Sequence, residues 1–231
     1  ISKDGKEFSK FGANEFIQSI KSNNLCHSVK GYLRYAEYLG LNTNEIELTL
    51  PEFDDKTISQ TDKLLQAVDL SKPMVVVAPA TTWKGKHWDK DCWKELIEKI
   101  EDKYSLVFTG MASDEDLVDY IGGNRHINLV GKTSLKVMIE ILRRANLLIS
   151  LDSGTTHLGW ATQVPKILSI FCCTPKELYA PLGNDNKYIS IQSSICKPCH
   201  HKKCPNAEKY VCTKSPSVDE VIAALDKLMV D

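Results

Sequence analysis

The feature that most constrains the fold is a regular alternation of short apolar runs and amphipathic stretches, starting at about residue 73. The apolar runs have the length and residue types of buried strands, at 74–78, 105–109, 126–130, 147–151 and 166–171. The amphipathic stretches have hydrophobic residues at helical spacing, at 91–102, 114–121, 134–144, 155–162 and 217–229. Strands that are apolar throughout and alternate with helices are typical of a parallel sheet covered on both faces. The sequence therefore predicts an α/β, Rossmann-like domain.

The N-terminal part of the chain does not follow this alternation. Residues 28–39 have a helical pattern, whereas residues 49–60, with Pro51 and several acidic side chains, have the composition of a linker. We therefore divide the chain into an N-terminal piece, 1–48, and a domain, 49–231. The chain starts with isoleucine and not methionine, which we expect of a processed chain or of a piece of a longer protein.

The charge and hydropathy of the chain argue against two classes of partner. The chain has 29 Lys and Arg residues and 30 Asp and Glu residues, interspersed, so its net charge of -1 favours neither nucleic acid nor acidic lipid. No stretch approaches the roughly 20 apolar residues that span a bilayer. The N-terminus also lacks a signal-peptide pattern. The default expectation is a cytoplasmic protein that does not bind nucleic acid.

The loop after the first predicted strand is the first candidate site, because ligands of such sheets bind beyond the carboxyl ends of the strands. Residues 79–88 include Thr81, Thr82, Lys84 and Lys86. Their hydroxyl, amide and ammonium groups suit phosphate oxygens. A polar surface loop without a ligand accounts for the same residues equally well.

The second candidate loop, 152–158, joins a predicted strand to a predicted helix. The backbone amides of Ser153 to Thr156 would lie at the N-terminus of that helix. Unpaired donors and the helix dipole favour a diphosphate there. The alternative on spacing alone is that Asp152 or Ser153 only caps the helix and that His157 packs in the core.

Taken together, the loops resemble a known family. Residues 152–158 read Asp-Ser-Gly-Thr-Thr-His-Leu, a signature of the ADP-heptose:lipopolysaccharide heptosyltransferases, glycosyltransferase family nine. Residues 80–97 are similar to the donor loop of that family, and Gly-Lys-Thr-Ser-Leu at 131–135 matches a third motif. The resemblance runs from about residue 28 to the C-terminus in consistent order and spacing. It implies the C-terminal, donor-binding domain of a GT-B glycosyltransferase.

The resemblance also implies a role for each matching residue in an ADP-heptose site. Lys86 and Asp152 are the catalytic candidates: Lys86 would neutralise the leaving diphosphate and Asp152 would contact the heptose. The donor phosphates would be bound by Thr81 and Thr82. The resemblance further implies that Asp114, where the family usually has Glu, binds the ribose and that Thr133 lines the adenine pocket. His157 would contact the edge of the sugar or phosphate. The diphosphate would be bound by Ser153, Gly154, Thr155 and Thr156.

The chemistry implied by the resemblance is an inverting transfer that requires no cofactor. A helix N-terminus and cationic side chains would stabilise the charge on the leaving diphosphate. The base that deprotonates the acceptor hydroxyl is, in this family, an aspartate of the N-terminal, acceptor-binding domain. Residues 1–48 resemble only the last helix of that domain. We therefore expect the isolated chain to bind donor without transferring sugar. The acceptor would be the lipopolysaccharide core, bound through the missing domain at the inner face of the inner membrane, with peripheral contact at most.

Two other functions fit parts of the sequence. A non-catalytic nucleotide-sugar-binding module that acts with a partner chain would share the same pocket and would differ in having no acceptor domain upstream. A zinc-ribbon-like nucleic-acid module would use the cysteines described next, although the neutral charge argues against it.

Four cysteines lie close together in a Pro- and Lys-rich segment, at Cys196, Cys199, Cys204 and Cys212. Their spacing suits a structural zinc ion. Two local disulfides, an iron–sulfur cluster or free thiols remain alternatives, although the spacing fits none of the common ferredoxin patterns. The other four cysteines, in apolar or helical context, are expected to be reduced and buried: Cys26, Cys92, Cys172 and Cys173.

Three tryptophans follow the first predicted strand and invite comparison with sugar-stacking sites. Trp93 lies on the apolar side of a predicted helix and Trp88 lies at its start, so both are expected in the core. Trp83, in the loop itself, is the one candidate for a ligand contact.

Overall fold

The computed structural model describes residues 27–44, 50, 52–183 and 186–230. The chain divides into two units, residues 1–47 and 48–231, and each is considered by itself. In the first unit, helix α2 (Ser28–Tyr38) confirms the predicted helix to within one residue, and the His27 ring accepts a hydrogen bond from the Val29 amide at its start. The assignment of residues 1–48 to the end of a larger domain stays a prediction, and much of that segment lies outside the described residues.

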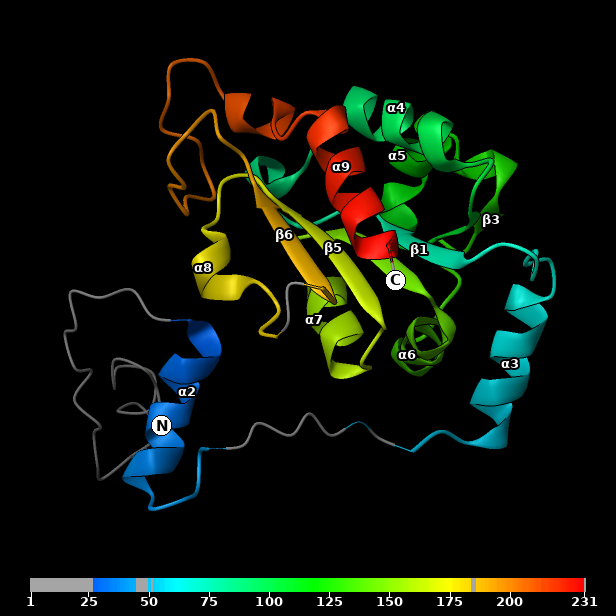
Figure 1. Ribbon diagram of the computed structural model, residues 1–231, viewed down its shortest axis with the longest axis horizontal. Coiled ribbons are helices and arrows are strands. Elements are labelled where there is room, and N and C mark those ends of the chain that lie inside the picture. The colour runs from blue at the N-terminus through cyan, green and yellow to red at the C-terminus, as the bar shows by residue number, and fades with distance from the viewer. Residues whose placement is uncertain (1–26, 45–49, 51, 184–185, 231) are drawn as a thin grey trace. The chain divides into compact units, whose positions relative to one another are not determined.

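The second unit is built on one six-stranded sheet in the order β3-β2-β1-β4-β5-β6, with every neighbouring pair parallel (Figure 1). Its strands are β1 (Met74–Ala78), β2 (Ser105–Phe108), β3 (Ile127–Asn128), β4 (Leu147–Leu151), β5 (Lys166–Phe171) and β6 (Tyr188–Gln192). All five predicted strands are present, and the predicted parallel sheet is confirmed. The strand order reverses direction between β1 and β4. In an open parallel sheet, this is where the crevice at the carboxyl ends of the strands forms.

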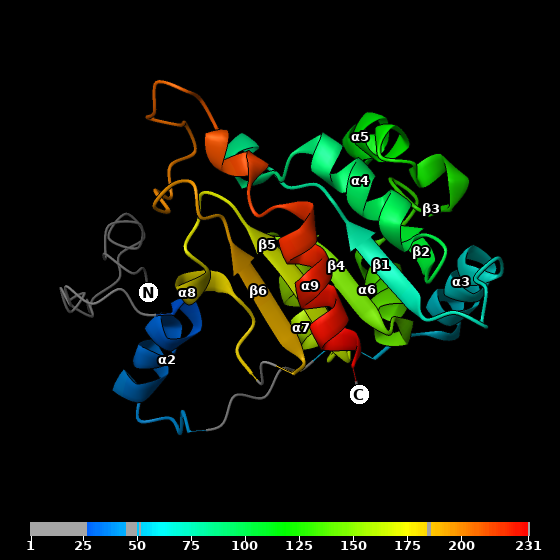
Figure 2. The same cartoon turned by 45° about the horizontal axis from the view of Figure 1, so that its top comes forward.

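Helices cover both faces of this sheet, as predicted (Figure 2). The main ones lie within two residues of the predicted stretches: α4 (Lys90–Ile100), α5 (Glu115–Tyr120), α6 (Leu135–Arg144), α7 (Gly154–Ala161) and α9 (Val218–Met229). The Ser134 side chain accepts a hydrogen bond from the Val137 amide and thereby caps the N-terminus of α6. Of the helices in the described part of the chain, none combines the length and apolar character needed to cross a membrane.

The central strands are mostly apolar because successive side chains enter two different core layers. Val75 packs in the same layer as residues of α4 and α9, whereas Val76 packs in the layer of α6. Trp88 and Trp93 are buried, as predicted, with their rings edge to face and 5.2 Å between centroids. The indole N–H of Trp88 donates to the carbonyl oxygen of Pro216 at 2.8 Å, which ties the start of α4 to the segment before α9.

The structure corrects the predicted linker at residues 49–60. Helix α3 (Asp55–Leu65) begins inside it, so the prediction is wrong from residue 55 onward. The helix starts there because the Asp54 carboxylate accepts hydrogen bonds from the amide and the hydroxyl of Thr57. Leu64 and Leu65 then pack against the core layer of α6. Two further elements were not predicted, the edge strand β6 and the short helix α8 (Lys176–Tyr179).

Candidate functional site

A cavity of about 610 Å³ lies at the carboxyl ends of the central strands. It is bounded by the loops after β1, β2 and β4, by the first residues of α6 and α7, and by Tyr179 of α8. All but one of the residues to which the family resemblance gave a role line it: Thr81, Thr82, Lys86, Asp114, Thr133, Asp152, Ser153, Gly154, Thr155 and His157. Residues that are distant in sequence therefore meet where the strand order reverses.

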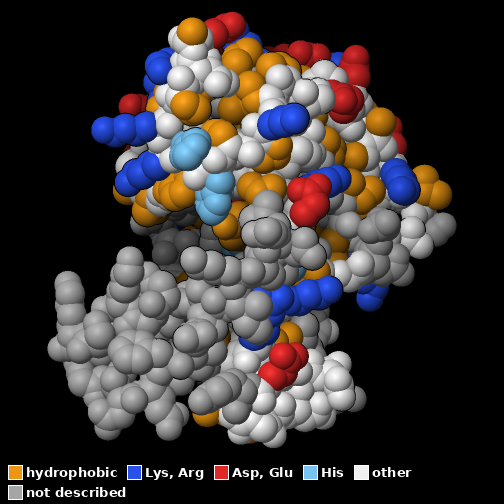
Figure 3. Space-filling model, turned by 90° about the vertical axis from the view of Figure 1, so that its left-hand side faces the viewer, with side chains coloured by type: hydrophobic (Ala, Val, Ile, Leu, Met, Phe, Trp, Pro, Cys, Tyr) orange, Lys and Arg blue, Asp and Glu red, His pale blue; other side chains and the backbone are white. Residues whose placement is uncertain are grey.

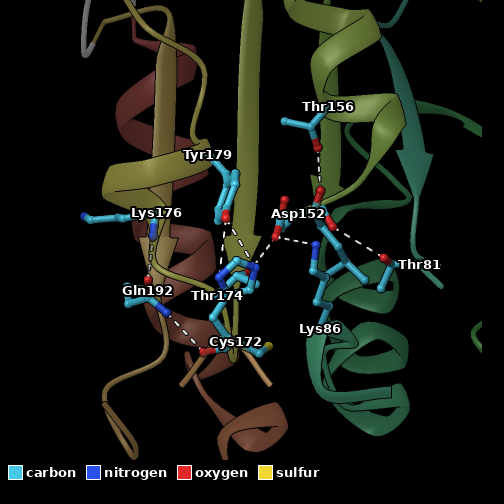
Figure 4. A network of polar contacts seen from close by, with 11 residues as sticks. Thr81, Lys86, Asp152, Thr156, Cys172, Thr174, Lys176, Tyr179 and Gln192 are labelled. Carbon is cyan, nitrogen blue, oxygen red and sulfur yellow. Dashed lines mark hydrogen bonds and ion pairs between the residues drawn. The ribbon is translucent and has the colours of Figure 1, made fainter. Parts of the chain in front are cut away.

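A largely buried ion pair lies on the wall of this cavity. The Lys86 ammonium is 2.8 Å from Oδ2 of Asp152, with side-chain exposures of only 18% and 5%. The Thr174 hydroxyl donates to the same carboxylate oxygen at 2.6 Å (Figure 4). The Lys86 ammonium also lies 4.7 Å from the centroid of the Trp83 ring. These contacts hold one positive charge at a defined place on the cavity wall.

The loop that carries Lys86 is folded back toward Asp152. Its last turn is a short 3-10 helix, η1 (Lys84–Lys86). His87 Nε2 lies 2.7 Å from the carbonyl oxygen of Thr81 and closes the loop, and the Thr81 hydroxyl donates to the carbonyl oxygen of Asp152 at 3.3 Å. The two candidate loops are thus joined to each other directly.

The N-terminus of α7 opens into the cavity next to this ion pair. Its N-cap residue is Ser153, whose side chain does not cap the helix, and His157 is exposed and does not lie in the core. The alternative that treated these residues as a cap and a core histidine is therefore wrong. The buried hydroxyls of Ser153 and Thr109 have no hydrogen-bond partner within the described residues. Both line the cavity, so each can bond to a ligand there.

Thr156 is the exception among the predicted residues. Its side chain is buried, and its hydroxyl bonds to the Ser150 hydroxyl at 2.7 Å and to the carbonyl oxygen of Leu151. These bonds join α7 to the end of β4 and point the hydroxyl away from the cavity. The role implied for the Thr156 backbone amide stays a prediction.

Where the loop after β2 and the first turns of α6 bound the cavity, its wall is apolar and exposed. Met111 is 59% exposed and Leu135 is 64% exposed, and both line the cavity together with Met138. Near them, the Asp114 carboxylate accepts a hydrogen bond from the Met111 amide at 2.8 Å. These apolar residues and Thr109 were not among the predicted site residues. The signal that could have indicated them is a large apolar side chain directly after a strand or at a helix start, where polar residues are usual.

The side chains of the four cysteines do not form the predicted metal centre. Cys196, Cys199, Cys204 and Cys212 line a second cavity, of about 250 Å³, together with Cys173. No three His, Cys, Asp or Glu side chains of the described residues are arranged to hold a metal ion. The sulfurs of Cys204 and Cys196 instead accept hydrogen bonds from the Tyr210 amide and the Asn206 side chain, at 3.3 Å and 3.5 Å.

The thiols differ in environment. All seven described cysteines are free, so the two local disulfides considered from the sequence are not formed. Burial raises the pKa of Cys212 to about 11, whereas hydrogen bonds from the Tyr210 and Asn206 amides lower the pKa of Cys204. Of the four scattered cysteines, Cys172 and Cys173 are buried as predicted, Cys92 is only half-buried, and Cys26 lies outside the described residues.

Comparisons with known proteins identify the family of the chain. The family model described as glycosyltransferase family 9 (heptosyltransferase) matches residues 10–210. Lipopolysaccharide heptosyltransferase 1 of Pseudomonas aeruginosa is 28% identical over 143 residues, which cover 61% of this chain and 40% of that protein. The chain thus spans less than half the length of that relative.

Two solved structures show the same fold. The glycosyl transferase family 9 structure from Veillonella parvula superposes with a TM-score of 0.79 at 20% identity, covering 96% of this chain and 64% of that one. The heptosyltransferase TibC of enterotoxigenic Escherichia coli, described as iron-containing and in complex with ADP-D-β-D-heptose, has a TM-score of 0.56 at 19% identity. The superposition with TibC covers 82% of this chain and 50% of that one.

Proposed function

The chain belongs to glycosyltransferase family 9, the heptosyltransferase family, and from this premise we propose that residues 49–231 bind the nucleotide-sugar donor ADP-heptose. The observation that carries the proposal is the buried Lys86–Asp152 pair beside the N-terminus of α7, inside a cavity of about 610 Å³. A positive charge and unpaired helix amides at one place suit a diphosphate.

The diphosphate of the donor would lie between Lys86 and the first turn of α7. The amides of Ser153, Gly154 and Thr155 have no partner inside the helix, and the helix dipole adds a partial positive charge. The unpartnered hydroxyls of Ser153 and Thr109 would donate to phosphate oxygens. Apart from the Asp152 carboxylate, which is paired with Lys86, these groups offer a hydrogen or a positive charge to an anion.

The nucleoside would extend toward the apolar end of the cavity. Met111 and Leu135 are large, exposed and apolar, and a purine base between them would cover both. Asp114 is half-buried and already oriented by the Met111 amide, which suits it to accept hydrogen bonds from ribose hydroxyls. Thr133 lies on the same part of the wall.

The proposed reaction is the inverting transfer of heptose from ADP to an acceptor in the lipopolysaccharide core. As the glycosidic bond to phosphate breaks, negative charge grows on the leaving diphosphate, and Lys86 with the α7 amides would stabilise it. A preorganised contact of this kind is typically worth on the order of 3 kcal/mol of barrier. Asp152 would orient the sugar. The base that removes the proton of the acceptor hydroxyl would come from a preceding acceptor-binding domain. The reaction would take place at the inner face of the inner membrane.

A nucleotide titration tests the proposal. In calorimetry with this chain, ADP and ADP-heptose are expected to bind at least about tenfold more tightly than UDP, because a pyrimidine covers less of Met111 and Leu135. GDP separates general purine binding from selection for adenine. Equal binding of ADP, GDP and UDP would contradict the proposed base pocket, and binding of none of them would contradict the proposed donor site.

Metal analysis tests the prediction made from the cysteine spacing. If Cys196, Cys199, Cys204 and Cys212 bind a metal, the purified chain is expected to contain about one equivalent of zinc or iron. The iron named for TibC makes iron the second element to measure. Cys199→Ser should lose the metal, whereas Cys92→Ser, at a half-buried cysteine on α4, should keep it. A metal content near zero in the unchanged chain would contradict the prediction.

A further inference from the structure

Three rings from three different segments meet beside the ion pair of the cavity. Trp83 precedes η1, Tyr179 ends α8, and His200 lies in the cysteine-rich segment. The His200 ring is 5.7 Å from Trp83 and 5.2 Å from Tyr179, measured between centroids. The Tyr179 hydroxyl lies 3.2 Å from Nε2 of His200. His200 therefore links Trp83, which packs on the Lys86 ammonium, to Tyr179.

Tyr179 lies at the end of the cavity opposite to the nucleoside. The loop after β2 carries Met111 and Asp114, and β2 is on one side of β1 in the sheet. Tyr179 follows β5, which is on the other side, beyond β4 and Asp152. In the view of Figure 4, Asp152 lies between Lys86 and Tyr179. A donor with its base at Met111 and its diphosphate at Lys86 thus directs its sugar toward Tyr179.

The position of His200 is set by its own backbone. Its amide donates to the carbonyl oxygen of Cys173 at 2.8 Å. Its φ of 52° lies in the left-handed region, which residues other than glycine adopt uncommonly. On the face of the molecule in Figure 3, histidine side chains lie among hydrophobic and basic ones. The backbone of His200 is thereby fixed, and its ring contacts those of Trp83 and Tyr179.

We propose that Tyr179 is a specificity-determining residue that contacts the sugar of the donor, and that His200 is the positioning residue that holds it. This inference rests on the proposed donor site and adds the residues that line it where the sugar would bind. A tyrosine ring offers an apolar face to the C–H groups of a sugar and a hydroxyl to its polar groups. The Tyr179 hydroxyl lies 3.3 Å from Nδ1 and 3.2 Å from Nε2 of His200, so this ring keeps the hydroxyl at its edge.

The test separates the nucleotide from the sugar. Calorimetry with ADP and with ADP-heptose is carried out on the unchanged chain and on Tyr179→Ala. Affinity for ADP-heptose is expected to fall about tenfold, while affinity for ADP changes less than about twofold. If the unchanged chain binds neither ligand, the proposed donor site itself fails. If it binds both and Tyr179→Ala weakens both equally or neither, the donor site stands and the sugar wall is overturned.

Further variants test the positioning role and avoid dependence on one substitution. Tyr179→Phe keeps the ring and loses only the hydroxyl, and His200→Ala loses the partner of that hydroxyl. Each variant should lower the affinity for ADP-heptose about threefold. The double variant should show no further loss, because both substitutions remove the same contact. His200→Gln, which can still bond to the hydroxyl, should restore most of the affinity. Additive losses, or an equal loss in the control His201→Ala, would overturn the role of His200.

Discussion

Replacement of Lys86 by methionine is expected to lower the affinity for ADP by about 10- to 100-fold, because a hydrogen bond to a charged group contributes about 1.5–3 kcal/mol. The same change should lower the free energy of unfolding by about 3 kcal/mol. The second effect follows from the Asp152 side chain, which is 5% exposed and would lose the ammonium 2.8 Å away while keeping the Thr174 hydroxyl. Methionine keeps most of the volume of the lysine stem, so the change removes mainly the charge.

A second substitution separates the two effects. In the double variant Lys86→Met, Asp152→Asn no carboxylate remains at position 152, so chemical denaturation should show most of the lost stability regained. Calorimetry should show that the ADP affinity is not regained, since the ammonium is still missing. Lys84→Met is the matched control, because Lys84 is exposed and lies over the Tyr210 ring instead. Recovery of ADP binding in the double variant would mean that Lys86 acts only by holding the fold.

The fold could be predicted where an element is buried on both faces, because such an element must be mostly apolar. The strands β1, β4 and β5 are covered on both faces, so they are apolar apart from Ser150, Lys166 and Ser169, and their bounds were predicted to the residue. Helix α3 was missed because its buried side carries Thr57 and Thr61, which are polar, so the apolar period is hidden. The Thr61 hydroxyl bonds to the carbonyl oxygen of Thr57 and is thereby satisfied inside the helix. The edge strand β6 was missed because it is only half-buried.

The site was predictable where it is made of contiguous motifs. The two loops around Lys86 and Asp152 were identified from their residue types and from the family resemblance, and the structure places both residues in contact. Thr156 belongs to the same motif, yet the direction of its side chain depends on a partner, Ser150, in the preceding strand. No local pattern indicates which residues of a motif turn inward.

Contacts between distant segments were not predictable from one sequence. Tyr179 and His200 are 21 residues apart and meet because α8 and the cysteine-rich segment converge after β5 and β6. The spacing of the four cysteines predicted a metal centre, but spacing does not say where each sulfur points. Cys212 is buried in the core, whereas Cys204 bonds to the Tyr210 amide.

The second large effect is expected at Gly154, at the start of α7. A Cβ added there meets nothing within 4 Å, and the residue lines the cavity where the diphosphate is proposed. Gly154→Val should therefore change the free energy of unfolding by no more than about 0.5 kcal/mol, as for a substitution in open space. Its branched side chain would occupy the approach to the helix amides, so the affinity for ADP should fall about tenfold or more.

Gly159 of the same helix gives the opposite expectation and serves as the control. A Cβ there would lie 2.4 Å from Cδ2 of Leu148, because α7 packs closely on β4 at this point. Gly159→Ala should lower the free energy of unfolding by about 1–3 kcal/mol through overpacking, with ADP affinity of the folded protein nearly unchanged. Calorimetry and denaturation of both variants thus distinguish a residue that faces the ligand from one that faces the core. Unchanged ADP affinity in Gly154→Val would mean that the diphosphate does not bind at the N-terminus of α7, and the role proposed for its amides would fall.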